Sequence, residues 1–300
     1  MKDGLIRIVR AGARTYIRYA PWKHGKRTLY TKIVKPWVLW RDGTATATTN
    51  SGVRHRVHLP DEIDSRIYYF GVWEPSVTRV FQNILKRGDT VVDIGANVGY
   101  YTLLSSKCVG PIGHVYAIEA SPTIYRMLVE GIKENAVDNV TPYLCAVHAE
   151  RMDIPIYRSD KSTLGMSTIM QPGMAHQFEA KVEARPLGDI VPLDRLLNAK
   201  LVKIDVEGAE WLVFQGIRPI LDRFSPQAHW LIEMAPERIG ADKAQQIFDT
   251  FISLGYSAWH VPNDYSDEEY FEPRKGELRR LNAAPAKQSD VLFARDHLAP

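Results

Sequence analysis

Glycines, an amide and carboxylates follow a short apolar run of the sequence in a spacing that could bind a nucleoside. Residues 89–99 read DTVVDIGANVG, and the next apolar run, residues 114–119, ends at Glu119. Gly95 and Gly99 allow a tight turn whose main-chain N–H groups can face a ligand at the start of a helix. Glu119, at the end of the second strand, can accept two hydrogen bonds from ribose hydroxyls. The spacing therefore predicts a nucleoside site.

A second stretch, residues 203–210 with the sequence KIDVEGAE, concentrates carboxylates directly after another apolar run. In doubly wound sheets, ligands bind beyond the carboxyl ends of the strands, near the point where the strand order reverses. A carboxylate or histidine within hydrogen-bond reach of a hydroxyl group can act as its general base. The candidates for this catalytic role are Asp205 and Glu207 first, followed by Glu233 and His229.

The same carboxylates also allow structural interpretations. Asp205 and Glu207 could cap the helix that follows them, since carboxylates stabilise the free N–H groups of a helix N-terminus. Lys203 is expected to pair with Asp205 or a nearby carboxylate, because an unpaired charge in an apolar strand is costly. Glu210 is expected in a salt bridge. Oxygen ligands from Asp205, Glu207 and Glu233 would suit magnesium, but no ligand spacing requires a metal, and we assign none.

The glycine spacing narrows the kind of nucleoside. A dinucleotide motif, Gly-x-Gly-x-x-Gly, that starts at Gly95 would require glycine at the positions of Asn97 and Tyr100. The order Asp-x-Gly-x-x-x-Gly, with an acidic residue ending the next strand, instead resembles the cofactor motif of class I S-adenosylmethionine methyltransferases. In those enzymes the loop passes under the methionine part of the cofactor. The resemblance implies this position for Asp93, Gly95 and Asn97.

Three stretches together resemble the FkbM family of class I S-adenosylmethionine-dependent methyltransferases: DIGANVGYYT at 93–102, VYAIEA at 115–120 and KIDVEGAE at 203–210. The resemblance spans roughly residues 69–294 and leaves out the N-terminal arm. The family usually has Glu-Pro after the second strand, where this chain has Glu-Ala. The resemblance implies methylation of a hydroxyl group of a sugar, a glycan or a polyketide-like natural product, with S-adenosyl-L-methionine as the cofactor.

The resemblance and the turn together assign the cofactor-binding residues. Glu119 is expected on the ribose and Asp205 beside the transferable methyl group. Ala146 and Val147 are expected on the adenine side, with plain core packing as the alternative. The full cofactor set is Asp93, Gly95, Ala96, Asn97, Gly99, Tyr101, Thr102, Glu119, Ala120, Ala146 and Asp205.

The alternation of apolar runs with helical patterns predicts an α/β fold, with a doubly wound, seven-stranded, mostly parallel sheet of the Rossmann-like type. A long polar segment, residues 159–177, lies between short strands at 152–157 and 181–185. A loop of this length in a compact domain is typical of a lid, and we expect it to cover the acceptor site. Residues 262–288 are expected to form a surface loop with a helix at 267–270. The strands are predicted at residues 91–94, 114–119, 140–147, 201–205, 230–233, 257–261 and 290–294.

Length and composition fit one main domain with an extension. We expect residues 1–60 to form a basic N-terminal extension, a helix with a hairpin, and residues 61–300 to form the methyltransferase domain. The 300-residue sequence has no apolar run near the roughly 18 residues of a membrane span. Its two cysteines, Cys108 and Cys145, sit in no metal spacing, and no signal-peptide pattern is visible. These features predict a cytoplasmic location.

The net charge of +3 hides an asymmetry between the arm and the rest. Residues 1–60 hold 13 Lys or Arg against two Asp, a charge of +11, which leaves −8 for the remainder. Such an arm attracts phosphate groups of nucleic acid or of a lipid surface, so peripheral membrane contact stays open. The interpretation we favour is a solvated amphipathic helix, with Arg7, Arg10, Arg14 and Arg18 in one row, that packs on the domain or forms a homodimer.

Two other functions stay open. A nucleic-acid methyltransferase could use the basic arm as a phosphate-binding surface. However, amino-group methylation of bases typically uses an Asn/Asp-Pro-Pro-aromatic segment, where this chain has DVEG at 205–208, and neither cysteine follows a proline as cytosine-carbon methylation would need. A nucleic-acid acceptor is therefore disfavoured. The third function is a non-catalytic binding protein on the same fold, because fold does not fix function.

Overall fold

The computed structural model describes residues 2–22, 24–39, 41, 43–159, 167–168, 176–263, 265–272 and 277–295. The chain divides into two compact units. The first comprises Met1–Pro75 with Asp264–Arg274, and the second comprises Ser76–Asn263 with Lys275–Pro300. The first unit thus runs past residue 60, where we expected the N-terminal extension to end, and takes in part of the predicted surface loop.

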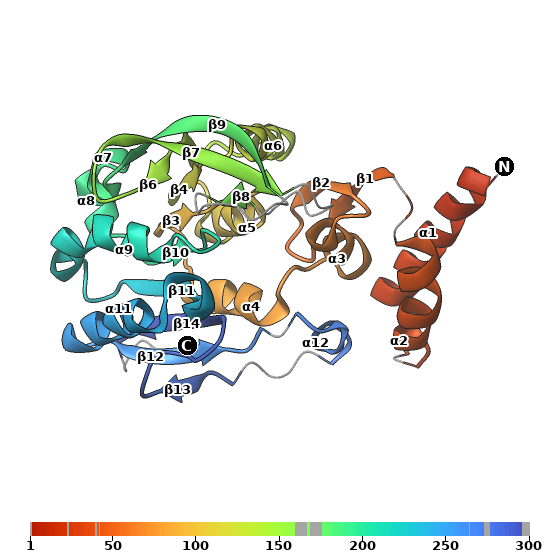
Figure 1. The fold of residues 1–300 in the computed structure, drawn as a ribbon. Helices are drawn as coiled ribbons and strands as arrows, with labels where there is room; N and C mark the ends of the chain where they lie inside the picture. The colour runs from red at the N-terminus through yellow and green to blue at the C-terminus, as the bar shows by residue number, and fades with distance from the viewer. Residues whose placement is uncertain are drawn as a thin grey trace. The chain divides into compact units, whose positions relative to one another are not determined.

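The second unit is built on an eight-stranded sheet whose five consecutive strands at one side run parallel (Figure 1). These five are, in order across the sheet, β5 (Val140–Leu144), β4 (His114–Glu119), β3 (Thr90–Ile94), β10 (Leu201–Ile204) and β11 (His229–Met234). Antiparallel pairing then adds β14 (Ser289–Ala294), β12 (Ser257–Val261) and β13 (Arg279–Leu281). The predicted doubly wound α/β fold is confirmed.

The number of strands differs from the prediction by one. All seven predicted strands are present, and β13 is an additional strand at the edge of the sheet. It has only three residues, of which Arg279 and Arg280 are exposed. Such a strand has neither the length nor the apolar alternation that reveals a strand in a sequence. The helix predicted at 267–270 is present as α12 (Asp267–Phe271).

Helices cover both faces of this sheet, with α9 and α11 on one side and α4 and α5 on the other (Figure 1). Successive strand residues point to opposite faces. Val92, Ile94 and Val202 therefore pack into the large apolar core under α9 and α11, whereas Asp93 and Lys203 face the other way. The helices of this unit are α4 (Pro75–Ile84), α5 (Tyr100–Val109), α6 (Pro122–Glu134), α7 (Leu187–Ile190), α8 (Leu193–Leu197), α9 (Glu210–Ile217), the 3-10 helix η2 (Arg218–Arg223), α10 (Pro236–Ile239) and α11 (Ala241–Ser253).

A second sheet of the same unit has four strands in the order β6-β9-β7-β8. The run 140–147, predicted as one strand, is split at Cys145, because Val140–Leu144 pairs with β4 whereas Ala146 pairs with Ala184. The two short strands predicted to flank the lid are present and longer. Of the lid predicted at 159–177, residues 159, 167–168 and 176–177 belong to these strands, and the rest of the predicted lid lies outside the described residues. The strands are β6 (Ala146–Val147), β7 (Met152–Ser159), β8 (Ser167–Thr168) and β9 (His176–Arg185).

The first unit contains the helix and the hairpin predicted for the arm. Its elements are α1 (Lys2–Tyr19), α2 (Lys26–Leu29), the π-helix η1 (Tyr30–Val38), β1 (Thr44–Thr48), β2 (Arg54–His58), α3 (Glu62–Phe70) and α12. Ion pairs hold α12 to this unit: Asp267 lies 2.7 Å from Lys35 Nζ and 3.1 Å from Arg66 Nη2, and Arg27 pairs with Glu268. No helix in the described ranges is both long and apolar enough to cross a bilayer.

The arginine row of α1 turns toward its own unit. Arg10 is 5% exposed and donates a hydrogen bond to Val38 O at 3.2 Å. The Arg14 guanidinium lies 4.8 Å from the centre of a tyrosine ring, and Arg18 donates to an asparagine carbonyl at 3.1 Å. The expectation of a solvated row is therefore wrong for Arg10, whereas Arg14 and Arg18 are half-buried. Their long stems can pack along apolar surface while the guanidinium reaches acceptors and rings beyond it.

Candidate active site

The turn after β3 is held against the end of β4 by main-chain hydrogen bonds. The N–H groups of Gly95 and Ala96 both donate to Ile118 O, at 2.9 and 3.0 Å. Gly95, Asn97 and Gly99 have φ values of 80°, 52° and 91°. Glycine adopts this left-handed conformation without strain, and asparagine adopts it more readily than most residues. The tight turn predicted from the glycine spacing is therefore present.

Gly95 also brings this turn into contact with the end of β10. A Cβ atom added to Gly95 would lie 1.7 Å from Asp205 O, so no side chain fits at this position. A hydrogen bond also joins the two segments, because the Asp205 N–H donates to Ile94 O at 3.0 Å. Gly95 thus serves to pack two loops from neighbouring strands. The sequence indicated the tight turn and the approach of a ligand, but not this contact between the two loops.

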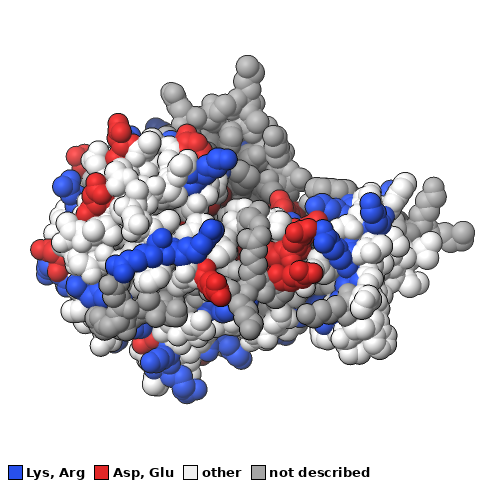
Figure 2. Space-filling view, turned by 90° about the horizontal axis from the view of Figure 1, so that it is seen from below, with Lys and Arg blue, Asp and Glu red and all other residues white. Residues whose placement is uncertain are grey.

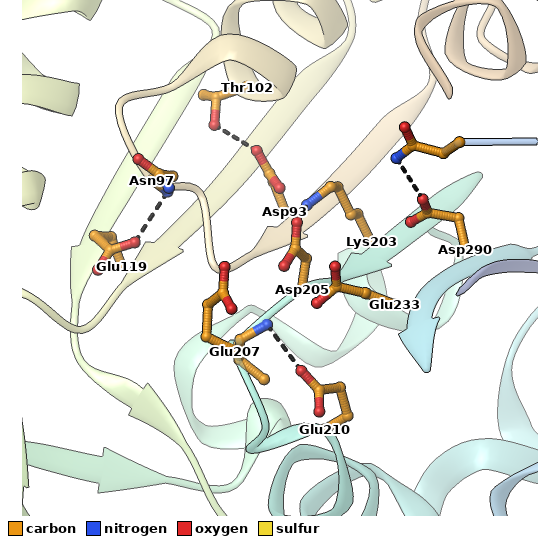
Figure 3. A network of polar contacts seen from close by, with 12 residues as sticks. Asp93, Asn97, Thr102, Glu119, Lys203, Asp205, Glu207, Glu210, Glu233 and Asp290 are labelled. Atoms are coloured by element: carbon orange, nitrogen blue, oxygen red, sulfur yellow. Dashed lines mark hydrogen bonds and ion pairs between the residues drawn. The ribbon is translucent and has the colours of Figure 1, made fainter. Parts of the chain in front are cut away.

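Glu119 ties the glycine turn to the start of α6. Its Oε2 accepts a hydrogen bond from Asn97 N at 2.9 Å (Figure 3), and its Oε1 accepts one from Ser121 N at 2.8 Å. Burial raises the pKa of Glu119 to about 7, although these hydrogen bonds favour the ionised form. Each carboxylate oxygen has a second lone pair, so the ionised group can accept further hydrogen bonds from hydroxyls.

A buried polar layer lies between the sheet and α5. Asp93 and Lys203 are register partners on β3 and β10, and they are 0% and 4% exposed. Asp93 Oδ2 accepts from Thr102 Oγ1 at 2.6 Å. Lys203 Nζ lies 2.8 Å from Asp205 Oδ2 and 5.0 Å from the centre of the Tyr101 ring. The predicted pairing of Lys203 with Asp205 is confirmed.

The second carboxylate oxygen of Asp93 is less well satisfied. Burial raises the pKa of Asp93, whereas the charge of Lys203 and the hydrogen bond from Thr102 lower it. Asp93 Oδ1 is buried and accepts no hydrogen bond from any residue that the structure describes. A buried acceptor without a donor is costly, so a donor group on a ligand would be stabilising here.

Three of the four predicted catalytic side chains gather at the carboxyl ends of β10 and β11. Asp205, Glu207 and Glu233 lie close together (Figure 3). The Asp205 side chain is 31% exposed and that of Glu207 28%, whereas Glu233 is 5% exposed. Arg238 donates to Glu207 Oε2, and Gln288 donates to Glu233 Oε1. In the described part of the chain, no group of three His, Cys, Asp or Glu side chains is arranged to hold a metal ion.

The protonation of these carboxylates differs. Burial, followed by the charges of Asp205, Asp290 and Glu207, raises the pKa of Glu233 to about 10, so this group is protonated at neutral pH. Burial also raises the pKa of Glu207, which the charge of Arg238 opposes. Asp205 and Glu207 are thus the two partly exposed carboxylates of the cluster, with Lys203 beside Asp205 and Arg238 beside Glu207. Glu207 has a left-handed φ of 53°, a strained conformation that clusters at functional sites.

The start of α9 is held by Glu210. Its Oε1 accepts hydrogen bonds from Gly208 N at 3.0 Å and from Val206 N at 3.3 Å, and α9 has no side-chain N-cap. Capping by Asp205 or Glu207 is therefore wrong, and so is the salt bridge expected for Glu210. The physical reason is the turn between β10 and α9, which directs these main-chain N–H groups toward Glu210 (Figure 3).

His229 lies at the amino-terminal end of its strand, whereas the other candidates lie at the carboxyl ends of β10 and β11. It begins β11 and is the register partner of Leu201, the first residue of β10. Glu233 lies four positions further along the strand, a distance of about 13 Å. Its Nδ1 lies 3.0 Å from Gln227 O. The structure does not bring His229 to the site, and we remove it from the candidate bases.

Two residues of the predicted cofactor set, Ala146 and Ala120, lie together, whereas Val147, the other residue expected on the adenine side, packs in the large apolar core. Ala146 is 7% exposed and belongs to a small apolar cluster with Ile156 and Val182 of the second sheet, against which Ala120 packs. Ala120 directly follows Glu119 in the sequence. An apolar surface next to the carboxylate that is expected on the ribose suits an adenine ring, so both residues stay in the predicted cofactor set.

Sequence reasoning missed several polar residues that α10 and β14 add to this edge. Asp290 is the register partner of Glu233 and accepts a hydrogen bond from Asn263 Nδ2 at 2.8 Å (Figure 3). Gln288 precedes β14 by one residue, and Arg238 lies on α10. Because β14 runs antiparallel to β11, its first residues lie at the edge where the parallel strands end. The direction of this last strand is therefore the feature from which Gln288 and Asp290 could have been predicted at the site.

Comparisons with known proteins agree on the kind of domain. Residues 93–258 match the model of the methyltransferase FkbM domain, a span of more than half of the 300 residues. The tRNA (guanine(37)-N(1))-methyltransferase Trm5b of Pyrococcus abyssi is 28% identical over 173 residues, which cover 55% of this chain and 50% of that protein. A protein-L-isoaspartate O-methyltransferase of Ignicoccus hospitalis is 40% identical over 57 residues, 19% of this chain and 27% of that protein.

A solved structure of an S-adenosylmethionine-dependent O-methyltransferase from Thermotoga maritima is 13% identical, covers 84% of this chain and 77% of its own, and superposes with a TM-score of 0.41. The present chain spans half or less of the length of the two curated relatives named above. What those relatives act on is therefore a property of those proteins.

Proposed function

Because the chain belongs to the FkbM methyltransferase family, we propose that it transfers a methyl group from S-adenosylmethionine to a hydroxyl group of a sugar, a glycan or a polyketide-like natural product. One observation carries the proposal. Asp205 is a partly exposed carboxylate at the carboxyl end of β10, 2.8 Å from Lys203 Nζ, in contact through its main chain with the glycine turn. A base at this place can serve an acceptor hydroxyl next to the cofactor.

The residues at the carboxyl ends of the parallel strands fit S-adenosylmethionine. Glu119 offers the ribose two carboxylate oxygens, and Asp93 Oδ1 is a buried acceptor that a ligand donor would satisfy. Ala120 and Ala146 supply apolar surface for the adenine. The excess of carboxylates over the cations of this edge suits a sulfonium ion, which is positively charged. When bound, the cofactor supplies an electrophilic methyl group.

The chain's own residues then have separate tasks. An alcohol becomes a good nucleophile only as its proton leaves, so Asp205 accepts that proton as the general base. Lys203 holds the Asp205 carboxylate in position through their 2.8 Å ion pair. Burial and the neighbouring carboxylates raise the pKa of Glu233 to about 10, so Glu233 is a poor proton acceptor at neutral pH, and Asp205 is the first choice of the two partly exposed carboxylates. Arg238 holds Glu207 at the rim of the cluster.

Incubation with isotope-labelled S-adenosylmethionine, followed by mass analysis of candidate glycans and natural-product intermediates, tests this function. The proposal expects a gain of one methyl group on a hydroxyl oxygen. Transfer to nitrogen or carbon alone would contradict the O-methylation, and a chain that binds the cofactor without any transfer would support a binding protein instead.

A nucleic-acid acceptor is the second candidate, because the Trm5b relative is named for a tRNA substrate and the arm of this chain is strongly basic. Several cations of that arm are already engaged: Arg27 and Lys35 pair with α12, and Arg10, Arg14 and Arg18 turn inward. Adding tRNA to the labelling experiment separates the two acceptors, since label that enters RNA alone would favour this candidate.

We expect the substitution Glu119→Gln to weaken S-adenosylmethionine binding by about tenfold to a hundredfold. The amide replaces one acceptor oxygen with an NH₂ group, which would face a main-chain N–H of Asn97 or Ser121 and could not accept a ribose hydroxyl. Isothermal titration calorimetry at about pH 8 measures the affinity. Glu130→Gln, an exposed carboxylate on α6, is the matched control and should bind like the wild type.

The affinity should also depend on pH. The pKa of Glu119 lies near 7, so the ionised form that accepts hydroxyl hydrogen bonds becomes dominant as pH rises through this value. We therefore expect S-adenosylmethionine to bind more tightly at about pH 8 than at about pH 6. The Glu119→Gln variant should lose this difference. A wild-type affinity that stays constant across this range would contradict the ribose contact.

A further inference from the structure

The first unit exposes a large share of the apolar side chains that reach the surface. Among the residues that the structure describes, 13 large hydrophobic side chains are exposed, and six of them lie between residues 5 and 37. Large apolar side chains left exposed in such number in one segment of a chain point to an interaction site. The arm surface consists of Leu5 (63% exposed), Ile8 (70%), Tyr19 (66%), Trp22 (59%), Ile33 (47%) and Trp37 (72%).

Helix α1 turns an uncharged face outward. At 3.6 residues per turn, Leu5, Ile8, Gly12 and Tyr19 fall on one side of the helix. All four are exposed, whereas Ile17 and Arg10, on the other side, are buried. A surface helix normally directs its charged residues to water and its apolar stripe to the core. The outer face of α1 is therefore suited to a surface that is itself apolar.

Aromatic and basic side chains accompany this face. Trp22 follows α1, and Ile33 and Trp37 lie four residues apart on one side of η1. Arg7 and Lys32 are exposed directly beside Ile8 and Ile33. Residues 1–41 contain 11 Lys or Arg and a single acidic residue, Asp3. Figure 2 shows, on the right of the view, lysine and arginine side chains between uncharged area and a group of acidic side chains.

We propose that the arm surface docks on an anionic lipid bilayer, with its apolar side chains in the headgroup region and Arg7 and Lys32 against the lipid phosphates. Tryptophan and tyrosine are favoured at the membrane interface, and an apolar helix face flanked by Lys and Arg is typical of helices that lie in that interface. A second copy of the chain fits less well, because each copy would bring the same positive charge to the contact.

Co-sedimentation with vesicles tests the proposal without any need for methyl transfer, so its failure is distinct from failure of the proposed function. The full chain should bind phosphatidylcholine vesicles that contain about 30% phosphatidylserine and bind pure phosphatidylcholine at least about tenfold more weakly. The emission of exposed Trp22 and Trp37 should shift to shorter wavelength on binding. Raising the salt concentration should weaken the binding, because the cations are exposed.

The double substitution Leu5→Glu and Ile8→Glu should lower vesicle binding by at least about tenfold, since two apolar side chains no longer leave water. The matched control is Ile112→Glu, because Ile112 is 75% exposed in the second unit, and it should bind like the wild type. Circular dichroism verifies that all variants are folded.

Four results would overturn the proposal. The first is no co-sedimentation of the wild type with anionic vesicles. The second is an equal loss for Ile112→Glu. The third is a dimer, seen by light scattering, that the double variant dissociates while no form binds lipid; the arm surface would then contact a second copy. Binding of tRNA that the double variant leaves intact and that vesicles do not displace would likewise assign the cations to RNA.

Discussion

Replacing Asp205 with Asn will lower the rate of methyl transfer by about a hundredfold to ten-thousandfold, the usual contribution of general-base catalysis. The amide has the size of the carboxylate but cannot accept the hydroxyl proton. S-adenosylmethionine affinity should change by less than about threefold, because the glycine turn contacts the Asp205 main chain, which the substitution keeps. Initial rates with the acceptor found by labelling, together with calorimetric titration of the cofactor, give the two values.

The matched control for Asp205→Asn is Asp222→Asn, an exposed carboxylate on η2, whose rate should equal that of the wild type. If Asp205→Asn lowers affinity and rate to the same extent, Asp205 shapes the cofactor site and is not the base. If it leaves the rate unchanged, Glu207 becomes the remaining accessible carboxylate to test.

Replacing Gly95 with Ala will destabilise the second unit by about 3–5 kcal/mol. The left-handed φ of 80° costs a non-glycine residue about 1–2 kcal/mol, and the new methyl group would lie 1.7 Å from Asp205 O, so the loops after β3 and β10 must move apart. A melting temperature lower by about 10 °C is expected for a domain of this size. Cofactor binding should be lost as well, because the separated loops no longer form one edge.

The control for Gly95→Ala is Gly131→Ala in α6. There φ is ordinary for a helix, and the nearest atom to an added Cβ lies 3.6 Å away. Alanine should raise stability slightly at this position, since it has the higher helix propensity. A Gly95→Ala variant that melts within about 2 °C of the wild type would show that the two loops are not packed together as described.

Much of the fold could be predicted from the sequence, because buried parallel strands are short β-branched runs bounded by glycine and polar residues. The strands around Val92 and Val202 are of this kind. β13 could not be predicted, since Arg279 and Arg280 of this short edge strand are exposed. The break at Cys145 was also missed, because an uninterrupted apolar run does not reveal that its two halves pair with different sheets.

The candidate site was predictable where it depends on strand ends, as for Asp93, Glu119 and Asp205. It was not predictable where it depends on strand direction or on a loop's path. His229 was placed at the site although it begins its strand, and Asp290, which begins an antiparallel strand at the right edge, was overlooked. Glu210 was expected in a salt bridge, whereas the local path of the main chain gives it two N–H donors.

The most direct test of the account is a crystal structure with S-adenosylhomocysteine, the product form of the cofactor. We expect the ribose hydroxyls within about 3.2 Å of the Glu119 carboxylate oxygens, the adenine against Ala120 and Ala146, and the sulfur on the side of Asp205. A ligand bound elsewhere, or one whose sulfur lies on the far side of the glycine turn from Asp205, would contradict it.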